Sequence, residues 1–289
     1  MCDEDTEADL RGRVPGLSRR AFTAAGVAAA FAATLPRGAR AADLVERDVV
    51  VRTPDGAVDC HFVHPATGPA PAVLVWPDIL GLRPAFRTMG RRLAAAGHAV
   101  LTVNPYYRSA PAPVVPEGAS FGDPPIRQRV MPLARSLSPE TVATDARAFV
   151  AWLDARDAVD RSRPMASTGY CMGGPMMLRT AATLPDRVRA GASFHGSRLV
   201  TDGADSPHLL VPELRGRYLL AIAENDDERQ PEAKTVLREA FAAAGTPAEI
   251  EVYEGAMHGW CAIDSRAYAE AQAERAYARL LALLDTALA

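Results

Sequence analysis

The chain has 289 residues, of which 48% are hydrophobic and 23% are charged, a composition typical of a folded globular protein. Its formal net charge of -3 at pH 7 provides no basic surface for nucleic acid. After residue 42, no apolar run reaches the roughly 18 residues that a membrane span needs. The composition therefore argues against a nucleic-acid-binding protein and predicts no stable membrane span in the mature chain.

The first 41 residues have the features of an export signal. Ser18-Arg19-Arg20-Ala21-Phe22 resembles the twin-arginine motif, an uncharged apolar stretch follows from Ala21 to Leu35, and Ala39-Arg40-Ala41 is a typical cleavage signal. An amphipathic helix is the alternative, but the alanine-rich stretch has no polar face. We therefore expect residues 1–41 to be a signal peptide read by the twin-arginine export machinery. Residues 42–289 would then form a single domain that acts in the periplasm or outside the cell.

Strands and helices alternate along the rest of the chain, which favours a mostly parallel sheet with helices on both faces. Two early strands are close enough to form an antiparallel hairpin across Thr53-Pro54-Asp55-Gly56. The predicted strands are Val45–Arg52, Ala57–Val63, Ala72–Trp76, Ala99–Val103, Met165–Gly169, Ala190–Phe194, Tyr218–Ala223 and Glu249–Tyr253. The predicted helices are Pro84–Ala96, Pro139–Arg156, Gly174–Leu184, Pro231–Ala244 and Arg266–Leu288.

The segment from Asn104 to Leu137 holds seven prolines and little periodicity. We expect a long loop there, and a loop of this length in a compact domain usually acts as a lid or a pocket wall.

The sequence Gly169-Tyr170-Cys171-Met172-Gly173-Gly174 has the pattern of a nucleophile elbow, a sharp strand-to-helix turn that exposes one side chain. Such a turn tolerates only small residues two positions before and after the nucleophile, and glycine occupies both positions. A predicted strand precedes the turn, and apolar residues at helical spacing follow it. The alternative is a glycine-rich helix start with a buried structural cysteine.

A cysteine nucleophile needs a base and a third group to orient that base, and in this kind of fold the order along the chain is nucleophile, acid, histidine. Asp226 and Asp227 follow one predicted strand, and His258 follows the next. We prefer Asp226 as the orienting carboxylate because it is nearer to its strand. Alternatively, the two aspartates cap the helix near Pro231 and His258 is a solvated loop residue.

These motifs resemble the dienelactone hydrolase family of α/β-hydrolases. The resemblance rests on residues 169–174, on Glu-Asn-Asp-Asp at 224–227 and on Tyr-Glu-Gly-Ala-Met-His-Gly-Trp at 253–260, and it extends from about Val49 to Leu284. It implies an α/β-hydrolase fold, with a mostly parallel central sheet flanked by helices on both faces. It also implies a catalytic triad of Cys171, Asp226 and His258 that hydrolyses an ester or lactone through an acyl-thioester, as a carboxymethylenebutenolidase does.

The segment Trp76–Leu82 matches the loop after the family's first central strand. In that family a carboxylate at this position interacts with the resting thiol, and the next backbone N–H contributes to the oxyanion hole. By residue match these are Asp78 and Ile79, with the Met172 amide as the second donor. Asp78 is one methylene shorter than the glutamate common at this position, and its alternative is a loop or helix-initiating aspartate.

Further residues are candidates for substrate binding. Arg108 resembles a family arginine that binds the substrate carboxylate, and its alternative is a surface arginine. A second such arginine is expected four positions after the histidine, where the chain has Ala262, which argues against dienelactone itself as the natural substrate. His195 could line the pocket or be a structural histidine, and Trp260 could wall the pocket or lie in the core.

The sequence as a whole indicates a carboxylic ester hydrolase that acts on a small-molecule ester or lactone. The histidines and cysteines have no spacing that builds a metal site, and this chemistry needs no metal or organic cofactor. The alternative from another class is a non-catalytic exported binding protein that retains the hydrolase scaffold.

Overall fold

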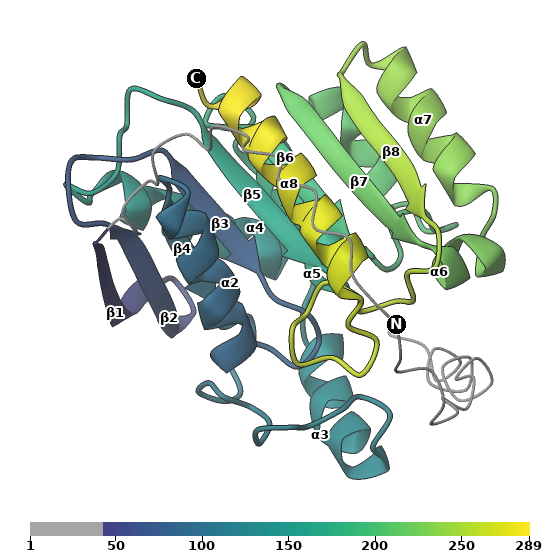
Figure 1. Cartoon of the computed structure of the whole chain (residues 1–289), viewed down its shortest axis with the longest axis horizontal. Coiled ribbons are helices and arrows are strands. Elements are labelled where there is room, and N and C mark those ends of the chain that lie inside the picture. The colour runs from purple at the N-terminus through teal and green to yellow at the C-terminus, as the bar shows by residue number, and fades with distance from the viewer. Residues whose placement is uncertain (1–42) are drawn as a thin grey trace, which may run out of the picture.

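The computed structural model describes residues 43–289, so the expected signal peptide at 1–41 lies outside the described residues. An eight-stranded sheet with the order β1-β2-β4-β3-β5-β6-β7-β8 runs through the molecule (Figure 1). Strands β3 to β8 pair in parallel, whereas β1 and β2 form an antiparallel hairpin whose second strand pairs antiparallel with β4. The strands are β1 (Leu44–Thr53), β2 (Gly56–Pro65), β3 (Ala72–Trp76), β4 (Ala99–Val103), β5 (Met165–Tyr170), β6 (Val188–Phe194), β7 (Arg217–Ala223) and β8 (Ala248–Tyr253).

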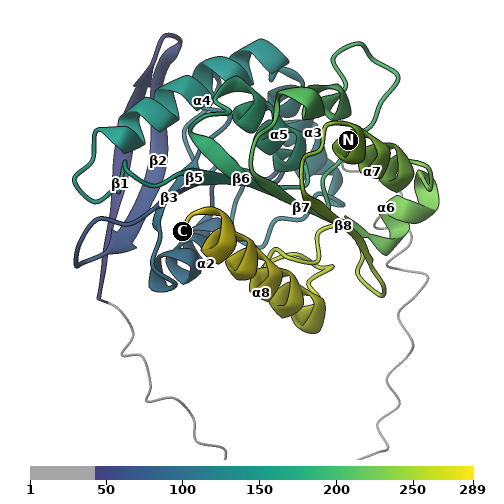
Figure 2. The same cartoon turned by 90° about the horizontal axis from the view of Figure 1, so that it is seen from above.

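Helices cover both faces of the sheet, with α2 and α8 on one face and α4, α5 and α7 on the other (Figure 2). Strand β3 is buried throughout, with Leu74 and Trp76 packing into one core and Val73 and Val75 into the other. Alternate side chains of a strand point to opposite faces of the sheet. Because helices cover both faces, all residues of β3 are apolar. The helices are α2 (Pro84–Ala95), α3 (Pro124–Arg135), α4 (Pro139–Asp154), α5 (Gly173–Thr183), α6 (Glu224–Arg229), α7 (Ala233–Ala243) and α8 (Glu270–Ala287), with a 3-10 helix at Pro207–Glu213.

The strand order reverses direction beside β3. The chain passes from β3 to its neighbour β4 on one side and then crosses to β5 on the other side of β3. The loops that leave the carboxyl ends of β3 and β5 therefore diverge, which opens a crevice at this edge of the sheet. In open α/β sheets, ligands bind at such a switch point.

The expected α/β-hydrolase architecture is confirmed, and so is the hairpin, in which Thr53 pairs with Gly56. The expectation of one uninterrupted loop from 104 to 137 is wrong, because α3 lies within it. Pro124 and Pro125 occupy the first turn of α3. Backbone N–H groups in a first turn make no hydrogen bond within the helix, so proline, which has no N–H, removes none there. Its one buried residue, Val130, packs against a small cluster formed by loop residues.

The boundaries of other elements also differ from the expectation. The last helix begins at Glu270 and not at Arg266. A short helix, α6, forms directly after β7 where only a loop was expected. Residues 265–269 form turn and irregular structure before α8, and α6 has only six residues, too few to give a periodic signal in the sequence.

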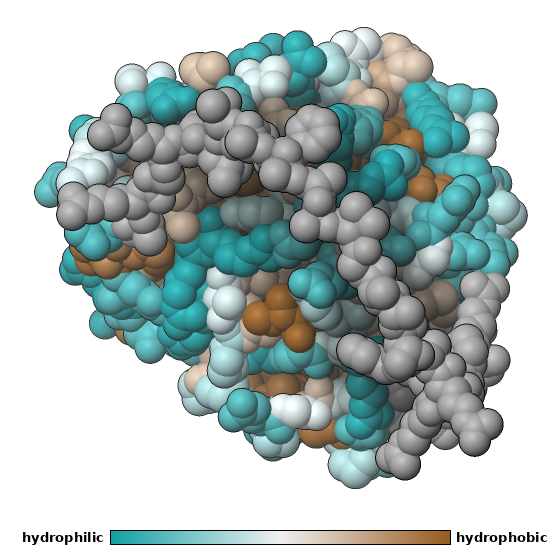
Figure 3. Space-filling model, in the orientation of Figure 1, coloured by the Kyte–Doolittle hydropathy of each residue, from teal (hydrophilic) through white to brown (hydrophobic). Residues whose placement is uncertain are grey.

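Hydrophilic residues cover most of the described surface in the view of Figure 3, and hydrophobic residues show only in separate patches. Among residues 43–289, no helix has the length and apolar character that crossing a bilayer requires.

Candidate active site

The candidate residues lie where five neighbouring parallel strands end. Asp78 and Ile79 follow β3, Cys171 follows β5, and His195 follows β6. Asp226 lies in α6 after β7, and His258 follows β8. Parallel strands have their carboxyl ends at one edge of the sheet. Residues as far apart in the chain as Asp78 and His258, which are separated by 180 positions, therefore come together at this edge.

Cys171 occupies the strained position of a strand-to-helix turn, with a φ of 51°. A Cβ at Gly169 would lie 1.9 Å from the Gly173 carbonyl oxygen, and one at Gly173 would lie 2.4 Å from the Trp76 carbonyl oxygen. The turn is therefore too tight for any side chain at these two positions. It is held by a hydrogen bond that the Cys171 N–H donates to the Phe194 carbonyl at 3.0 Å.

His258 and Asp226 form the expected pair. His258 Nδ1 lies 2.6 Å from Asp226 Oδ2, and the His258 backbone N–H donates to Asn225 Oδ1 at 2.8 Å. Asp227, the alternative carboxylate, instead pairs with Lys234 at 2.6 Å. The contacts thus favour Asp226 as the carboxylate that orients the histidine. Two adjacent residues of α6 hold His258, Asn225 through its backbone and Asp226 through its ring.

His195 lies against the histidine of this pair. Its ring centroid is 5.0 Å from that of His258 and 5.1 Å from that of Trp260, both in edge-to-face geometry. The ring is buried, and neither nitrogen has a hydrogen-bond partner among the residues that the structure describes. Burial, with a smaller effect from nearby His258, holds the pKa of His195 well below its usual value, so the ring is neutral.

Trp260 lies in the core behind His195. Its ring stacks on Tyr253 at 5.3 Å and is fully buried. This placement matches the core alternative and supports the ring of His195 from behind. We therefore do not retain Trp260 among the proposed substrate-binding residues.

The loop after β3 carries the expected oxyanion residue Ile79. The Tyr106 hydroxyl donates to the Ile79 carbonyl at 2.8 Å and lies 3.3 Å from the sulfur of Met172, so it links the two expected oxyanion donors. Asp78 accepts from the backbone N–H of Leu80 and forms a two-pronged ion pair with Arg83, at 2.6 and 2.9 Å. Both Asp78 oxygens are thus engaged by Arg83, which differs from the expected role beside the thiol.

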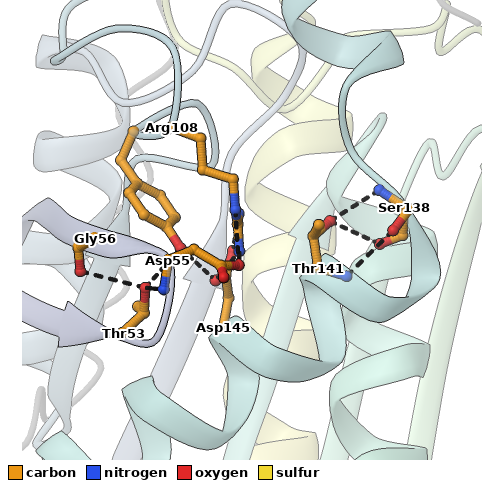
Figure 4. A network of polar contacts seen from close by, with 8 residues as sticks. Thr53, Asp55, Gly56, Arg108, Ser138, Thr141 and Asp145 are labelled. Atoms are coloured by element: carbon orange, nitrogen blue, oxygen red, sulfur yellow. Dashed lines mark hydrogen bonds and ion pairs between the residues drawn. The ribbon is translucent and has the colours of Figure 1, made fainter.

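Arg108 lies in a different network (Figure 4). Its guanidinium donates to both oxygens of Asp145 in α4, at 2.7 and 2.8 Å, and to Asp55 in the β1–β2 turn. Two carboxylates therefore occupy the donors that a substrate carboxylate would need. The structure assigns Arg108 to holding the hairpin turn against α4, and we do not retain it as a substrate-binding residue.

A cavity of about 380 Å³ adjoins the elbow. Ile79 and Met172 line it, as do Val142 of α4 and Met176 of α5. Three arginines, Arg135, Arg179 and Arg198, and one carboxylate, Asp205, also line it. The cavity combines an apolar wall with a net positive charge, beside the backbone groups that were expected to form the oxyanion hole.

Several of these residues were not identified from the sequence. They include Arg83, Tyr106, Asn225 and the cavity arginines. Arg83 contacts Asp264 across 181 residues, and no local pattern reveals a partner at that distance. Asn225 carried a usable signal, since it directly precedes the carboxylate that was expected to orient the histidine.

The family model of the dienelactone hydrolases, described as "Dienelactone hydrolase family", matches residues 58–288, most of the chain. The chain belongs to the dienelactone hydrolase family. A protein of Methylorubrum extorquens that is provisionally named carboxymethylenebutenolidase is 29% identical over 289 residues, 95% of each chain. The carboxymethylenebutenolidase of Rhodococcus opacus is 26% identical over 216 residues, which cover 73% of this chain and 79% of that protein.

The fold is also that of solved members of the family. A structure from Klebsiella pneumoniae, provisionally named dienelactone hydrolase, superposes with a TM-score of 0.73 at 22% identity, covering 84% of this chain and 99% of that one. The chain is therefore a dienelactone hydrolase-like enzyme. Within residues 43–289, no group of three or more His, Cys, Asp or Glu side chains is placed to hold a metal ion.

Proposed function

We propose that this enzyme cleaves a carboxylic ester or lactone through a thioester on Cys171. The observation that carries the proposal is the 2.6 Å contact between His258 and Asp226, at the same sheet edge as a glycine-enforced turn that carries a cysteine. A histidine oriented by a carboxylate is the base that such a nucleophile requires.

In the proposed mechanism, His258 accepts the thiol proton and the Cys171 sulfur attacks the substrate carbonyl carbon. The backbone N–H groups of Ile79 and Met172 stabilise the negative charge that develops on the carbonyl oxygen. The C–O bond then breaks, and His258 returns the proton to the leaving alkoxide. Water, deprotonated by His258, hydrolyses the thioester and restores the thiol, while Asp226 fixes the tautomer of His258 throughout.

The alternative of a non-catalytic binding protein is not favoured. The matched family and the named relatives are hydrolases, and the contact between His258 and Asp226 is the one that a catalytic role requires.

The test compares Cys171→Ala with Cys261→Ala on an activated ester. Cys261 is a buried free cysteine whose pKa is raised by burial, so its replacement removes a thiol without chemical consequence. The assay includes a thiol reductant, because the proposed nucleophile must be a free thiol. We expect Cys171→Ala to lower kcat at least about 1000-fold, as removal of a nucleophile does, and Cys261→Ala to stay within about twofold of wild type.

A second readout identifies the intermediate. Rapid acid quenching followed by mass spectrometry should find the acyl group of the substrate on the peptide that contains Cys171. Turnover by Cys171→Ala at the wild-type rate, or an acyl group on a serine, would refute the proposal.

We further propose that the enzyme acts in the periplasm or outside the cell, because residues 18–22 carry the twin-arginine pattern. Cell fractionation of the full chain tests this, with Arg19→Lys/Arg20→Lys as the variant. The variant should stay in the cytoplasm with residues 1–41 attached, while the native chain is exported and begins at Ala42. Equal distribution of the two chains would contradict export by this route.

A further inference from the structure

Arg83 is a buried arginine held between two carboxylates. Only 5% of the residue is exposed. Its guanidinium contacts Asp78 at 2.6 and 2.9 Å and Asp264 at 2.7 and 2.9 Å, and it also donates to the Gly81 carbonyl at 3.2 Å. Each carboxylate accepts two hydrogen bonds in parallel, the geometry in which a planar guanidinium fixes direction as well as distance.

The two carboxylates belong to different loops of the site. Asp78 lies in the loop after β3 and directly precedes Ile79, the proposed oxyanion donor. Asp264 lies between β8 and α8, six positions after His258. Arg83 itself is the cap residue of α2, so both loops are joined to a helix packed on the sheet.

The loop after β3 is held from its other side as well. The Tyr106 hydroxyl binds the Ile79 carbonyl, and the Gly81 N–H donates to the Asp78 carbonyl at 2.9 Å. The peptide units that follow Asp78 and Ile79, the first of which carries the Ile79 N–H, are therefore held in place before any substrate arrives. Donors that are fixed in advance stabilise a developing oxyanion without reorganising during the reaction.

We propose that Arg83 is a positioning residue that holds the Ile79 amide, through Asp78, and the His258 loop, through Asp264, in one catalytic geometry. This inference rests on the proposed function. Stability alone is a weak explanation for the arrangement, because a buried ion pair gains little over apolar residues of the same volume once the charges have been desolvated. A side chain that fixes the position of one loop relative to another needs directional contacts, and Arg83 makes such contacts with both loops.

The test uses Asp264→Asn, Arg83→Gln and Arg83→Lys in the full-length, reduced enzyme. A displacement of about 1 Å in a catalytic group can cost 100-fold in rate, so we expect Arg83→Gln to lower kcat roughly 100-fold and Asp264→Asn roughly 10-fold, with KM within about twofold. Arg83→Lys should recover part of the rate, since it keeps the charge but loses the paired contacts.

Arg92→Gln is the matched control. Arg92 lies on α2, the helix that Arg83 caps, and it also forms a two-pronged ion pair, with Glu274 of α8, at 2.8 and 2.6 Å. That pair joins the same helix to α8 away from the site, so kcat should stay within about twofold of wild type. Asp264 is 34% exposed, which makes Asp264→Asn the variant expected to fold even where Arg83→Gln does not.

A double variant completes the experiment. If Arg83 acts through Asp264, adding Asp264→Asn to Arg83→Gln should lower kcat no further. Wild-type kcat in Asp264→Asn, or an equal loss in Arg92→Gln, would overturn the inference. These results are separable from failure of the proposed function, which would instead appear as activity retained in Cys171→Ala.

Discussion

The carbonyl oxygen of Gly173 lies where residue 169 would carry a side chain, at 1.9 Å from the position of a Cβ. Backbone on both sides of this contact belongs to the elbow, so neither side can shift without moving Cys171. We expect Gly169→Ala to lower the free energy of unfolding by at least about 3 kcal/mol, the upper end of the usual cost of overpacking. Urea unfolding followed by circular dichroism measures this.

Gly118→Ala is the control for that prediction. Gly118 has a φ of 74°, and a Cβ there would meet nothing within 4 Å. The substitution therefore adds only backbone strain, of about 1 kcal/mol. Equal losses at the two positions would mean that the contact with Gly173 does not define the turn.

The proposed catalytic residues carry a signal in the sequence because their chemistry is rare and their order along the chain is fixed. Cys171 is enclosed by glycines, and Asp226 and His258 follow consecutive strands of the predicted sheet. Arg83 had no such signal, since arginine is common on helices and its contact with Asp264 exists only after the sheet has formed. For Arg108 the resemblance indicated a substrate contact, whereas two carboxylates of this chain bind it.

At the scale of elements, Arg108 connects the β1–β2 turn to α4 through Asp55 and Asp145. The side chain of Asp145 is 2% exposed, and burial raises its pKa even though Arg108 lowers it. Arg108→Met would leave this carboxylate without its cation, and we expect a loss of about 3 kcal/mol in the free energy of unfolding. Asp55→Asn removes only the exposed partner and should cost less than about 1 kcal/mol. Comparable losses of stability in the two variants would contradict the expectation that Arg108 stabilises the fold mainly through buried Asp145.

Glu46 of β1 makes stability depend on pH. It accepts one hydrogen bond from Arg91 of α2, at 2.8 Å, and lies 2.7 Å from His61 of β2. The hydrogen bond from Arg91, with a contribution from His61 and against a smaller effect of burial, lowers the pKa of Glu46 from 4.5 to about 2. Because the folded state favours the ionised form, Glu46 stabilises the fold above pH 4.5, and this contribution is lost as the pH falls towards 2.

The corresponding variant is Glu46→Gln, measured by urea unfolding at several pH values between 5 and 2.5. Glu46 is 34% exposed, so screening by solvent reduces the expected contribution to about 1 kcal/mol. The native chain should lose about that much more stability across this range than Glu46→Gln does. Glu117→Gln, at an exposed position, should follow the native chain. A native-like pH dependence in Glu46→Gln would contradict the assignment.

Most strands could be predicted to within one or two residues, because a buried parallel strand such as β3 is an uninterrupted apolar run. Helix α3 could not, since its prolines argue locally for a loop and its one buried residue, Val130, gives no periodic signal. What orders α3 is the cluster of Ile79, Tyr106 and Val114 against which it packs. That cluster joins segments that are distant in sequence.

In the whole molecule, the cavity is formed by segments that meet only after folding. Arg135 comes from the end of α3, Arg179 from α5 and Arg198 from the loop after β6. The backbone carbonyl of Asp205 accepts a hydrogen bond from Arg179, whereas Arg135 and Arg198 are exposed at the cavity. Positive charge beside an apolar wall should favour an ester that carries a negative group away from the scissile bond.

Arg198→Gln tests this charge preference with two esters of similar size, the p-nitrophenyl monoester of glutaric acid and p-nitrophenyl pentanoate. An exposed charge pair contributes up to about 1 kcal/mol, so kcat/KM for the anionic ester should fall by as much as about fivefold, while that for the neutral ester stays within about twofold. Added salt should reduce the difference, because exposed charges are screened over about 8 Å at physiological ionic strength. Arg52→Gln, an exposed position on β1, serves as the charge-matched control and should alter neither ester. Equal losses for both esters in Arg198→Gln would assign Arg198 to the shape of the cavity and not to recognition of charge.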